Sequence, residues 1–391
     1  MTVSTAGRLV VREIDPLEAP ASVVDAWSDL ERRALEPNAY SSPHFVIPAV
    51  RHLDRDGGVV VLGVERAPER SDASPSLAAV MVGRTVAASR DFPLPHLRVY
   101  ASRHSFLNGI LLDRQDGAAA LDTLLAYVED QPKRWHGLEI NDTWGDGQAY
   151  DLLAAATERR GIATHLWNER RRAVLRPHDD RARIEASEAA EARALSRRVR
   201  RLAERGEASL RLVCQGGIPD ASVEAFLALE HDGWKGDRGS SLRSTPCCER
   251  FFREMVARFG AEERAVFVEV QLDGNVVAST ANFISGYAGF AFKIGWQRAL
   301  AKLSPARLAE LELVRQLFRA DPLTALAFLD SGSPEGAYIE SLWPGRRPLV
   351  SLGLGTTALG RAVIRAMRAA RRVWRRYRTA CGGDGERPEP G

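Results

Sequence analysis

The sequence predicts a mixed α/β protein with two related halves, and two observations carry this prediction. In residues 265–330, three apolar, β-branched runs are separated by tight turns and are followed by a helical segment and a fourth apolar run. The first half of the chain has a similar order, with paired strands, a helix, and then a strand that ends in polar residues. We therefore expect two side-by-side halves, each a twisted, mostly antiparallel sheet flanked by helices.

The composition is that of a globular protein with a large core. The chain has 391 residues, of which 45% are apolar and 27% charged, and its formal charge of +3 does not by itself indicate nucleic-acid binding. Its four cysteines have neither metal-ligand nor disulfide-framework spacing, so we expect no metal and a reduced, cytoplasmic setting. No run approaches the roughly 18 apolar residues that a membrane span needs.

The first half is expected to cover residues 1–178, with a linker near residues 176–180. Apolar residues at helical spacing predict helices over residues 22–35, 117–128 and 150–160. Apolar and β-branched runs predict strands over residues 8–14, 59–64, 77–82, 137–140 and 163–175, with a strand pair over residues 97–112.

The second half is expected to cover residues 179–357. Helices are predicted over residues 187–205, 222–230, 250–259 and 306–318. Strands are predicted over residues 210–214, 265–270, 276–284, 289–296 and 324–330. Asp273-Gly274 supplies a hairpin turn because this pair tolerates positive φ. A basic amphipathic helix over residues 358–378 and a disordered tail over residues 379–391 are expected to follow.

Ser304 and Pro305 mark the start of the helix that follows the three-stranded run. Serine is a favoured N-cap and proline a favoured first helical residue. The free N–H groups and the dipole of such a helix start attract anions, for example a pyrophosphate. The alternative is that the two residues serve only as a helix cap.

Five short segments together resemble one protein family. They are residues 103–109 (RHSFLNG), 230–240 (EHDGWKGDRGS), 292–295 (FKIG), 304–305 (SP) and 329–332 (LDSG). The set resembles the CelD/BcsL group, bacterial proteins with the BioF-like acetyltransferase domain of the GNAT superfamily, a branch near the FemABX transferases. The likeness runs from about residue 27 to about residue 347. The chain departs from the pattern at Ala306, where the group prefers glycine, and at residues 298–303, which replace the superfamily's glycine-containing loop.

The resemblance implies two tandem GNAT-like halves and an acetyl-CoA-dependent N-acyltransferase. An amine on a small molecule, a sugar or an envelope precursor would attack the acyl-CoA thioester directly, without a covalent enzyme intermediate. The helix after the central strand would hold the pyrophosphate of the acyl-CoA. The candidate residues for this donor site are Lys302, Ser304, Ala306 and Arg307.

The catalytic candidates are Lys293, Asp330, Glu335 and Tyr338. Lys293 is either an anion or oxyanion contact, or a base with a lowered pKa; alternatively it reaches solvent or pairs with Asp330. Asp330 either assists the amine or closes an Asx-turn. Tyr338 would protonate the departing thiolate, as the superfamily resemblance implies.

The substrate-binding candidates are Glu230, Trp234, Lys235 and Glu340. The glycines at positions 233, 236 and 239 predict a flexible loop whose backbone can approach a ligand closely. The alternative is a surface turn in which Trp234 serves as a core anchor.

Two other functions stay open at this point. A FemABX-type transfer from aminoacyl-tRNA would suit the arginine-rich segments 187–205 and 358–378. A non-catalytic GNAT-like protein would use the helix over residues 358–378 to contact nucleic acid or a membrane surface. We expect instead that this helix packs its apolar stripe on the domain, and the stripe consists of Val363, Met367, Ala370, Trp374 and Tyr377.

Overall fold

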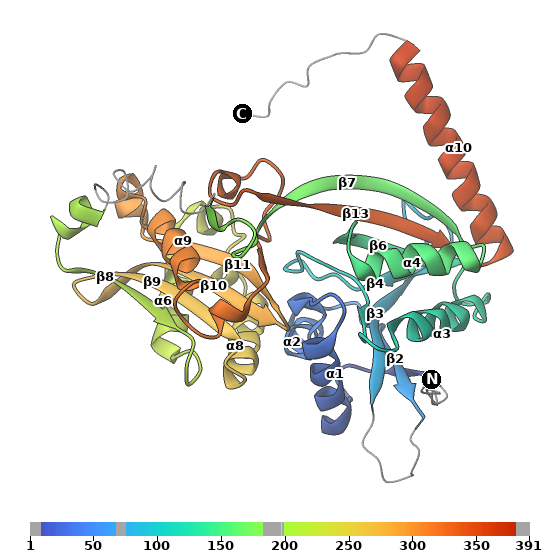
Figure 1. The fold of residues 1–391 in the computed structure, drawn as a ribbon, viewed down its shortest axis with the longest axis horizontal. Helices are drawn as coiled ribbons and strands as arrows, with labels where there is room; N and C mark the ends of the chain where they lie inside the picture. The colour runs from blue at the N-terminus through green and yellow to red at the C-terminus, as the bar shows by residue number, and fades with distance from the viewer. Residues whose placement is uncertain (1–8, 68–75, 183–196, 198, 381–391) are drawn as a thin grey trace.

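One sheet runs through both halves of the protein. The computed structural model describes residues 9–67, 76–182, 197 and 199–380. Within these residues, thirteen strands form a single sheet in which the long strands β7 (Ala163–Leu175) and β13 (Gly345–Gly355) join the two halves (Figure 1). The predicted mixed α/β fold with two tandem GNAT-like halves is confirmed, because each half has antiparallel strands followed by a parallel neighbour.

The first half begins with the antiparallel strands β1 (Leu9–Ile14), β2 (Val59–Arg66), β3 (Leu77–Val86) and β4 (His96–Val99). Strand β6 (Gly137–Trp144) then runs parallel to β4, with only Leu97–Leu138 and Arg98–Glu139 as paired residues. Four helices surround this sheet: α1 (Ala21–Arg33), α2 (Pro43–Leu53), α3 (Gly117–Glu129) and α4 (Gln148–Arg159).

The second half repeats this order. Strands β8 (Ala208–Val213), β9 (Ala265–Leu272), β10 (Asn275–Ser285) and β11 (Ala288–Trp296) are antiparallel, and β12 (Phe328–Asp330) runs parallel to β11. Its helices are α6 (Asp220–Asp232), α7 (Trp234–Asp237), α8 (Pro246–Ala261) and α9 (Pro305–Gln316). Helix α10 (Ala358–Ala380) follows β13 and packs on β7 and β13. Helix α6 packs on β10 and β11, and its buried apolar residues belong to one hydrophobic cluster. Helix α9 packs on β9, β10 and β11, and its buried apolar residues belong to a second cluster.

The two halves exchange their last strands. Strand β7 pairs with β12 of the second half, and β13 lies between β6 and β7 of the first half. A shared aromatic core also crosses the interface: Tyr40 and Phe45 of the first half contact Phe290 and Phe251 of the second. The division at residues 178 and 179 stays a prediction, since the sheet itself is continuous there.

Several predicted elements differ from the structure. The strand pair over residues 97–112 is wrong, because β5 (Leu111–Leu112) pairs with β3 and not with β4. The predicted strand over residues 324–330 begins with the 3-10 turn η4 (Leu323–Ala325), which leaves only the short β12. The loop after β11 contains the 3-10 helix η3 (Arg298–Leu303), and the glycine-rich segment after Gly233 forms α7 rather than a loop.

Helix α2 was not predicted, although its start carries a recognisable signal. The Ser42 hydroxyl accepts a hydrogen bond from the His44 backbone N–H at 3.2 Å, and Pro43 is the first helical residue. Pro48 inside the helix obscured the pattern. Most of the predicted helix 187–205 and nearly all of the predicted tail 379–391 lie outside the described residues.

Candidate functional site

A β-bulge positions Lys293 on β11. Ala281 of β10 pairs with Lys293, whereas the next residue, Asn282, pairs with Ala291, so Phe292 is the extra residue. A bulge re-aims the side chains around it. Lys293 thereby reaches helix α6, where its Nζ lies 3.6 Å from Glu230 Oε1.

Gly295 explains why α6 can lie so close to this strand. A Cβ atom at Gly295 would lie 2.6 Å from the Glu230 backbone nitrogen and 2.9 Å from the Leu229 carbonyl carbon. Only a residue without a side chain therefore fits at this contact. The glycine in the segment FKIG serves the packing that brings Glu230 to Lys293.

Glu230 faces two lysines. Its carboxylate is fully buried; Oε2 accepts a hydrogen bond from the Leu242 backbone N–H at 2.7 Å, and Oε1 lies 3.4 Å from Lys235 Nζ. Burial lowers the pKa of Lys293, and the charge of Lys235 lowers it further. One carboxylate cannot neutralise two ammonium groups, so this cluster attracts a further anionic or partly negative group.

His104 of the first half covers this cluster. Its ring stacks on Phe251 with centroids 5.6 Å apart and meets the edge of Phe292 at 6.2 Å. Burial lowers the pKa of His104 to about 3, and the charges of Lys293, Arg103 and Lys235 act in the same direction. The ring is therefore neutral at pH 7, and its buried Nε2 has no hydrogen-bond partner among the described residues. The segment 103–109 entered the sequence argument only as part of the family resemblance, so His104 is a site residue that the candidate set missed.

Strands β11 and β12 separate next to Lys293. Their parallel pairing covers only Ala288–Phe290 of β11, whereas β11 continues to Trp296. The chain after β12 turns away through Gly332, which has a φ of +62° and packs on the Ala291 carbonyl. Among the described residues, the remaining part of β11 thus has no ladder partner on the β12 side.

Helix α9 starts soon after β11, and its first turn is open only at the Ala306 backbone N–H. Pro305 has no N–H, and the Arg307 and Leu308 N–H groups donate to the Ser304 carbonyl oxygen. Pro305 is the first helical residue, as predicted, but Ser304 does not act as the predicted side-chain cap. Ser304 has a φ of 52°, in the left-handed region, and its hydroxyl makes no capping hydrogen bond. This backbone conformation is uncommon outside glycine and costs free energy. Lys302 is exposed, and Ala306 and Arg307 are partly buried around this turn.

Asp330 pairs with Arg172 and not with Lys293. Both side chains are buried, and Arg172 Nη1 lies 3.1 Å from Asp330 Oδ2. Asp330 Oδ1 also accepts a hydrogen bond from the Gly332 backbone N–H at 3.1 Å, which closes the expected Asx-turn. Asp330 therefore fixes the loop after β12 to β7, which the second half receives from the first.

Tyr338 lies beside α9 and contacts a carboxyl that the sequence did not single out. Its hydroxyl donates a hydrogen bond to Glu310 Oε1 at 3.2 Å. Burial raises the pKa of Glu310 to about 7, although the Tyr338 hydrogen bond acts in the opposite direction. A glutamate among the apolar residues of a helix was the only sequence signal, and it gave no indication of this pKa.

The other candidates hold local structure. Glu335 accepts a hydrogen bond from the Arg171 backbone N–H at 3.1 Å. Glu340 accepts one from the Gly336 backbone N–H at 2.7 Å and pairs with Arg346 at 3.1 Å. Trp234 belongs to α7 by its backbone, and its side chain lies outside the described part of the structure.

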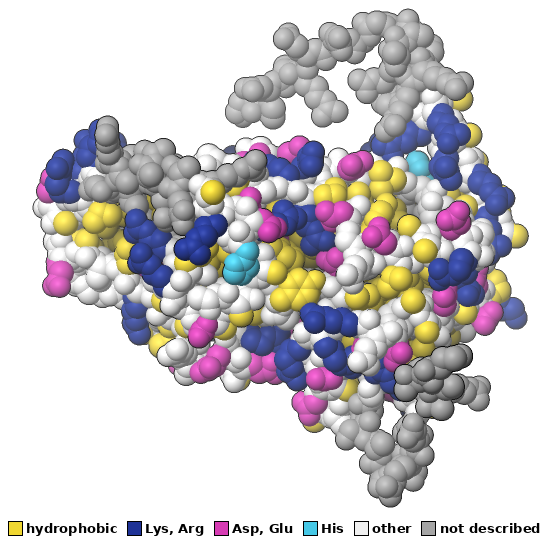
Figure 2. Space-filling view, in the orientation of Figure 1, with side chains coloured by type: hydrophobic (Ala, Val, Ile, Leu, Met, Phe, Trp, Pro, Cys, Tyr) yellow, Lys and Arg dark blue, Asp and Glu magenta, His cyan; other side chains and the backbone are white. Residues whose placement is uncertain are grey.

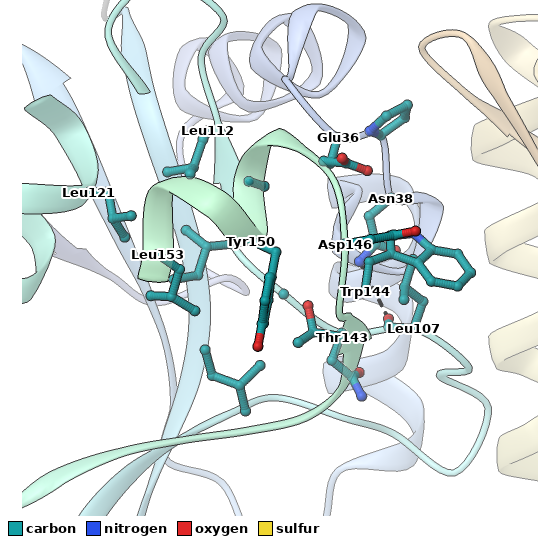
Figure 3. A pocket seen from close by; sticks show the side chains of 16 residues that line it. Glu36, Asn38, Leu107, Leu112, Leu121, Thr143, Trp144, Asp146, Tyr150 and Leu153 are labelled. Atoms are coloured by element: carbon teal, nitrogen blue, oxygen red, sulfur yellow. Dashed lines mark hydrogen bonds between the residues drawn. The ribbon is translucent and has the colours of Figure 1, made fainter. Parts of the chain in front are cut away.

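A separate pocket lies in the first half, at the end of β6 and beside α4 (Figure 3). Leu121 and Leu153 form an apolar end, whereas Glu36, Trp144 and Asp146 lie at the other end in this view. None of the sequence-predicted site residues lines it. Its other lining residues include Asn38, Leu107, Asn108, Gly109, Thr143 and Tyr150.

The polar end of this pocket has a fixed arrangement of charge. Arg347 bonds Glu36 at 2.9 Å and Asp146 at 2.7 Å, and its guanidinium lies 4.4 Å from the centroid of the Trp144 ring. The buried Trp144 indole N–H has no hydrogen-bond partner among the described residues. Burial raises the pKa of Glu36, and Arg347 opposes that shift. The pocket therefore offers a donor and two carboxylates beside an apolar wall.

Within the residues that the structure describes, no cluster of three or more His, Cys, Asp or Glu side chains is arranged to hold a metal ion. Among the described helices, none is both long enough and apolar enough to cross a membrane.

A protein-family model matches most of the second half. Residues 190–335 match the model of an acetyltransferase (GNAT) domain. A search of curated proteins found no match.

Solved structures share the fold of the whole chain at low identity. FemX is 8% identical, with a TM-score of 0.54 over 87% of this chain and 96% of its own. The C-terminal domain of a putative lysylphosphatidylglycerol synthetase from Agrobacterium fabrum is 12% identical, with a TM-score of 0.51 over 90% and 95%. L-PGS from Bacillus licheniformis is also 12% identical, with a TM-score of 0.50 over 93% and 98%. Residues 190–335 are thus similar to a GNAT domain, and the chain as a whole shares the fold of these structures.

Proposed function

We propose that this protein is an acyl-CoA-dependent N-acyltransferase and that acetyl-CoA is its donor. The separation of β11 and β12 beside the open first turn of α9 carries the proposal. An unpaired strand edge offers backbone N–H and C=O groups to an extended ligand such as the pantetheine arm. The helix start offers the Ala306 backbone N–H and a partial positive charge to a pyrophosphate.

The donor pyrophosphate would lie against Ser304, Ala306 and Arg307, with Lys302 at its outer side. Two basic side chains next to a helix N-terminus strengthen anion binding there. Ala306 replaces the glycine of the related group, but its methyl group carries no charge, and its backbone N–H remains available. A negative side chain at this position would oppose the phosphate charge.

The acceptor amine would attack the thioester carbonyl carbon as a free base. The C–N bond forms, and the carbonyl oxygen becomes an oxyanion that the surplus positive charge of Lys293 and Lys235 stabilises. The C–S bond then breaks, and CoA leaves as a thiolate. Burial raises the pKa of Tyr338, so its hydroxyl acts as a relay: the thiolate takes the Tyr338 proton as protonated Glu310, with a pKa of about 7, passes its own proton to the Tyr338 oxygen. The proton lost by the amine restores Glu310 through solvent.

The pocket of the first half is our candidate for the acceptor. Phe106 contacts Phe292 with centroids 5.7 Å apart, and the next residue, Leu107, lines this pocket, so one short segment separates it from the Lys293 cluster. Its apolar wall and its two carboxylates favour an amine that carries an apolar body. The acceptor would thus be bound mainly by the first half and the donor by the second.

A FemABX-type transfer from aminoacyl-tRNA is the second candidate. The surplus positive charge around Lys293, together with Arg103, would also suit a tRNA terminus. The amine would then attack an ester instead of a thioester. A non-catalytic GNAT-like binding protein is the third candidate.

Calorimetric titration separates these candidates. We expect acetyl-CoA to bind the purified, RNA-free protein, and CoA to bind more tightly than pantetheine, which lacks the pyrophosphate. Binding of aminoacyl-tRNA with a steep salt dependence, without any binding of acetyl-CoA at millimolar concentration, would favour the FemABX-type function. Binding of acetyl-CoA without turnover of any amine in an acceptor screen would favour the non-catalytic protein.

A further inference from the structure

Helix α10 is buried only near its start, and farther along it Arg371 donates a hydrogen bond to the Leu166 carbonyl oxygen at 2.8 Å. Gly360 and Ile364 are buried against β7 and β13, and a Cβ atom at Gly360 would lie 1.9 Å from the His136 carbonyl oxygen. The far end of the helix extends away from the sheet (Figure 1). Of the expected apolar stripe, Val363 and Met367 are partly buried and Ala370 is exposed, so the expected packing holds only in part for these residues. The side chains of Trp374 and Tyr377 lie outside the described part of the structure.

The exposed side of α10 carries an apolar stripe. Leu359, Val363, Ala366, Ala370 and Val373 follow each other at intervals of four, three, four and three residues, which places them on one face of a helix. Leu359 is 52% exposed and Val373 is 67% exposed, and both belong to the few large apolar side chains that the described structure leaves open to water. Four of these five residues are exposed, and Val363 is partly buried.

The charges of α10 have one sign. Arg361, Arg365, Arg368, Arg371 and Arg372 lie on the remaining faces of the helix, and the sequence contains no acidic residue between positions 341 and 383. Arg361 pairs with Glu129, and Arg371 donates to the Leu166 carbonyl, whereas Arg365, Arg368 and Arg372 are exposed. Figure 2 shows the resulting line of basic side chains along this edge of the molecule.

The combination of the apolar stripe and the arginines favours one kind of binding partner. A second copy of this helix, packed stripe to stripe, would bury the apolar residues but would leave the arginines without a partner of opposite charge. Nucleic acid would use the arginines but would leave Leu359 and Val373 in water. An anionic lipid surface satisfies both features, since apolar side chains enter the boundary of headgroups and acyl chains while arginines meet the headgroup charge.

We propose that α10 docks this protein onto an anionic membrane surface. The helix lies in the plane of the surface, with Leu359 and Val373 inserted and with Arg365, Arg368 and Arg372 at the headgroups. The docking does not depend on the donor or on the acceptor of the transferase reaction. It places the catalytic halves next to the membrane without a membrane-spanning segment.

Co-sedimentation of the full-length protein with vesicles tests this proposal. We expect binding to vesicles that contain phosphatidylglycerol and phosphatidylcholine, much weaker binding to pure phosphatidylcholine, and a loss of binding as salt rises. The triple variant R365A/R368A/R372A should bind roughly a hundredfold more weakly, because each arginine near an anionic surface contributes about fivefold. A matched control, R12A/R200A/R211A, removes three exposed arginines elsewhere and should bind as the wild type does.

The double variant L359S/V373S separates docking from simple charge attraction. It keeps every arginine, so a loss of vesicle binding at unchanged melting temperature supports insertion of the stripe. Wild-type binding by this variant, equal binding to both kinds of vesicle, or no vesicle binding at all would overturn the proposal. Binding of a short RNA duplex without vesicle binding would also overturn it, as would a dimer that the double variant abolishes while vesicles do not bind.

Discussion

Lys293 shows how much of a site depends on residues other than the one that sequence reasoning selects. The segment FKIG indicated a lysine on a central strand, and that placement is confirmed. Its partner was not predictable from local sequence, since Glu230 lies 63 positions earlier on another element and reaches Lys293 only because of a bulge and Gly295. The alternative pairing with Asp330 had the shorter sequence separation, but Arg172 takes that carboxylate.

Lys293→Ala should lower turnover at least tenfold, which corresponds to about 1.4 kcal/mol of transition-state stabilisation. The reason is the loss of positive charge near the developing oxyanion. Steady-state kinetics with acetyl-CoA and a reactive amine measure this effect, and Lys133→Ala is the control because Lys133 is exposed in the first half. Wild-type kinetics in the Lys293 variant would exclude this lysine from the reaction.

Glu310 should make the stability of the protein depend on pH. Burial raises its pKa from 4.5 to about 7, so the folded state keeps a proton that the unfolded state loses in this interval. Stability therefore falls as the pH rises from about 4.5 to 7, by on the order of 3 kcal/mol at about 1.4 kcal/mol per pKa unit.

Glu310→Gln should remove this loss, which urea unfolding at a series of pH values measures. Glu335→Gln is the control and should keep the slope of the wild-type protein, because Glu335 is exposed. Parallel pH profiles for wild type and Glu310→Gln would show that Glu310 titrates normally.

At the scale of elements, the sequence predicted the strands and turns that depend only on local residue patterns. The strands β9, β10 and β11 and the Asp273-Gly274 turn were expected from alternation and turn residues, and the structure confirms them. The bulge, the left-handed Ser304 and the 3-10 helix η3 were not, because they depend on how α6 and α9 pack on the sheet. Tertiary contacts thus decided the details that shape the site.

The contact between α6 and β11 gives a prediction at this scale. Gly295→Ala should destabilise the protein by about 1–3 kcal/mol, because its Cβ would meet backbone atoms of α6, which cannot move as a flexible side chain can. Gly233→Ala is the control, since a Cβ there meets nothing within 4 Å. Denaturant unfolding measures both variants, and equal midpoints would mean that α6 shifts without cost.

The whole molecule depends on pairings that no local pattern contains. Strand β13 lies between β6 and β7, although it begins 201 positions after the end of β6 and 170 positions after the end of β7. Strand β7 in turn completes the sheet of the second half. The sequence predicted the two halves from their similar order of elements, but it contained no sign of the exchange. Apolar runs show that a strand is buried, but they do not show which strand is its neighbour.

Because the two halves exchange strands β7 and β13, we expect that they do not fold separately. A fragment of residues 1–178 lacks β13, so β6 and β7 lose the strand that joins them. We expect this fragment to show no cooperative thermal transition, whereas a mixture with residues 179–391 regains one. Circular dichroism and NMR of the fragments measure this. A well-dispersed spectrum and a sharp transition for the first fragment alone would contradict it.

The central claim is that the open first turn of α9 binds the pyrophosphate of acetyl-CoA, and melting with and without this ligand tests it most directly. At 100 times its dissociation constant, acetyl-CoA should add about 2.7 kcal/mol to the stability of the folded protein. Ala306→Gly, which restores the residue of the related group, should keep the rise in melting temperature. Ala306→Asp should lose most of it, because a carboxylate then faces the phosphates. An equal rise in melting temperature for Ala306→Gly and Ala306→Asp, or no rise for the wild-type protein, would contradict the account.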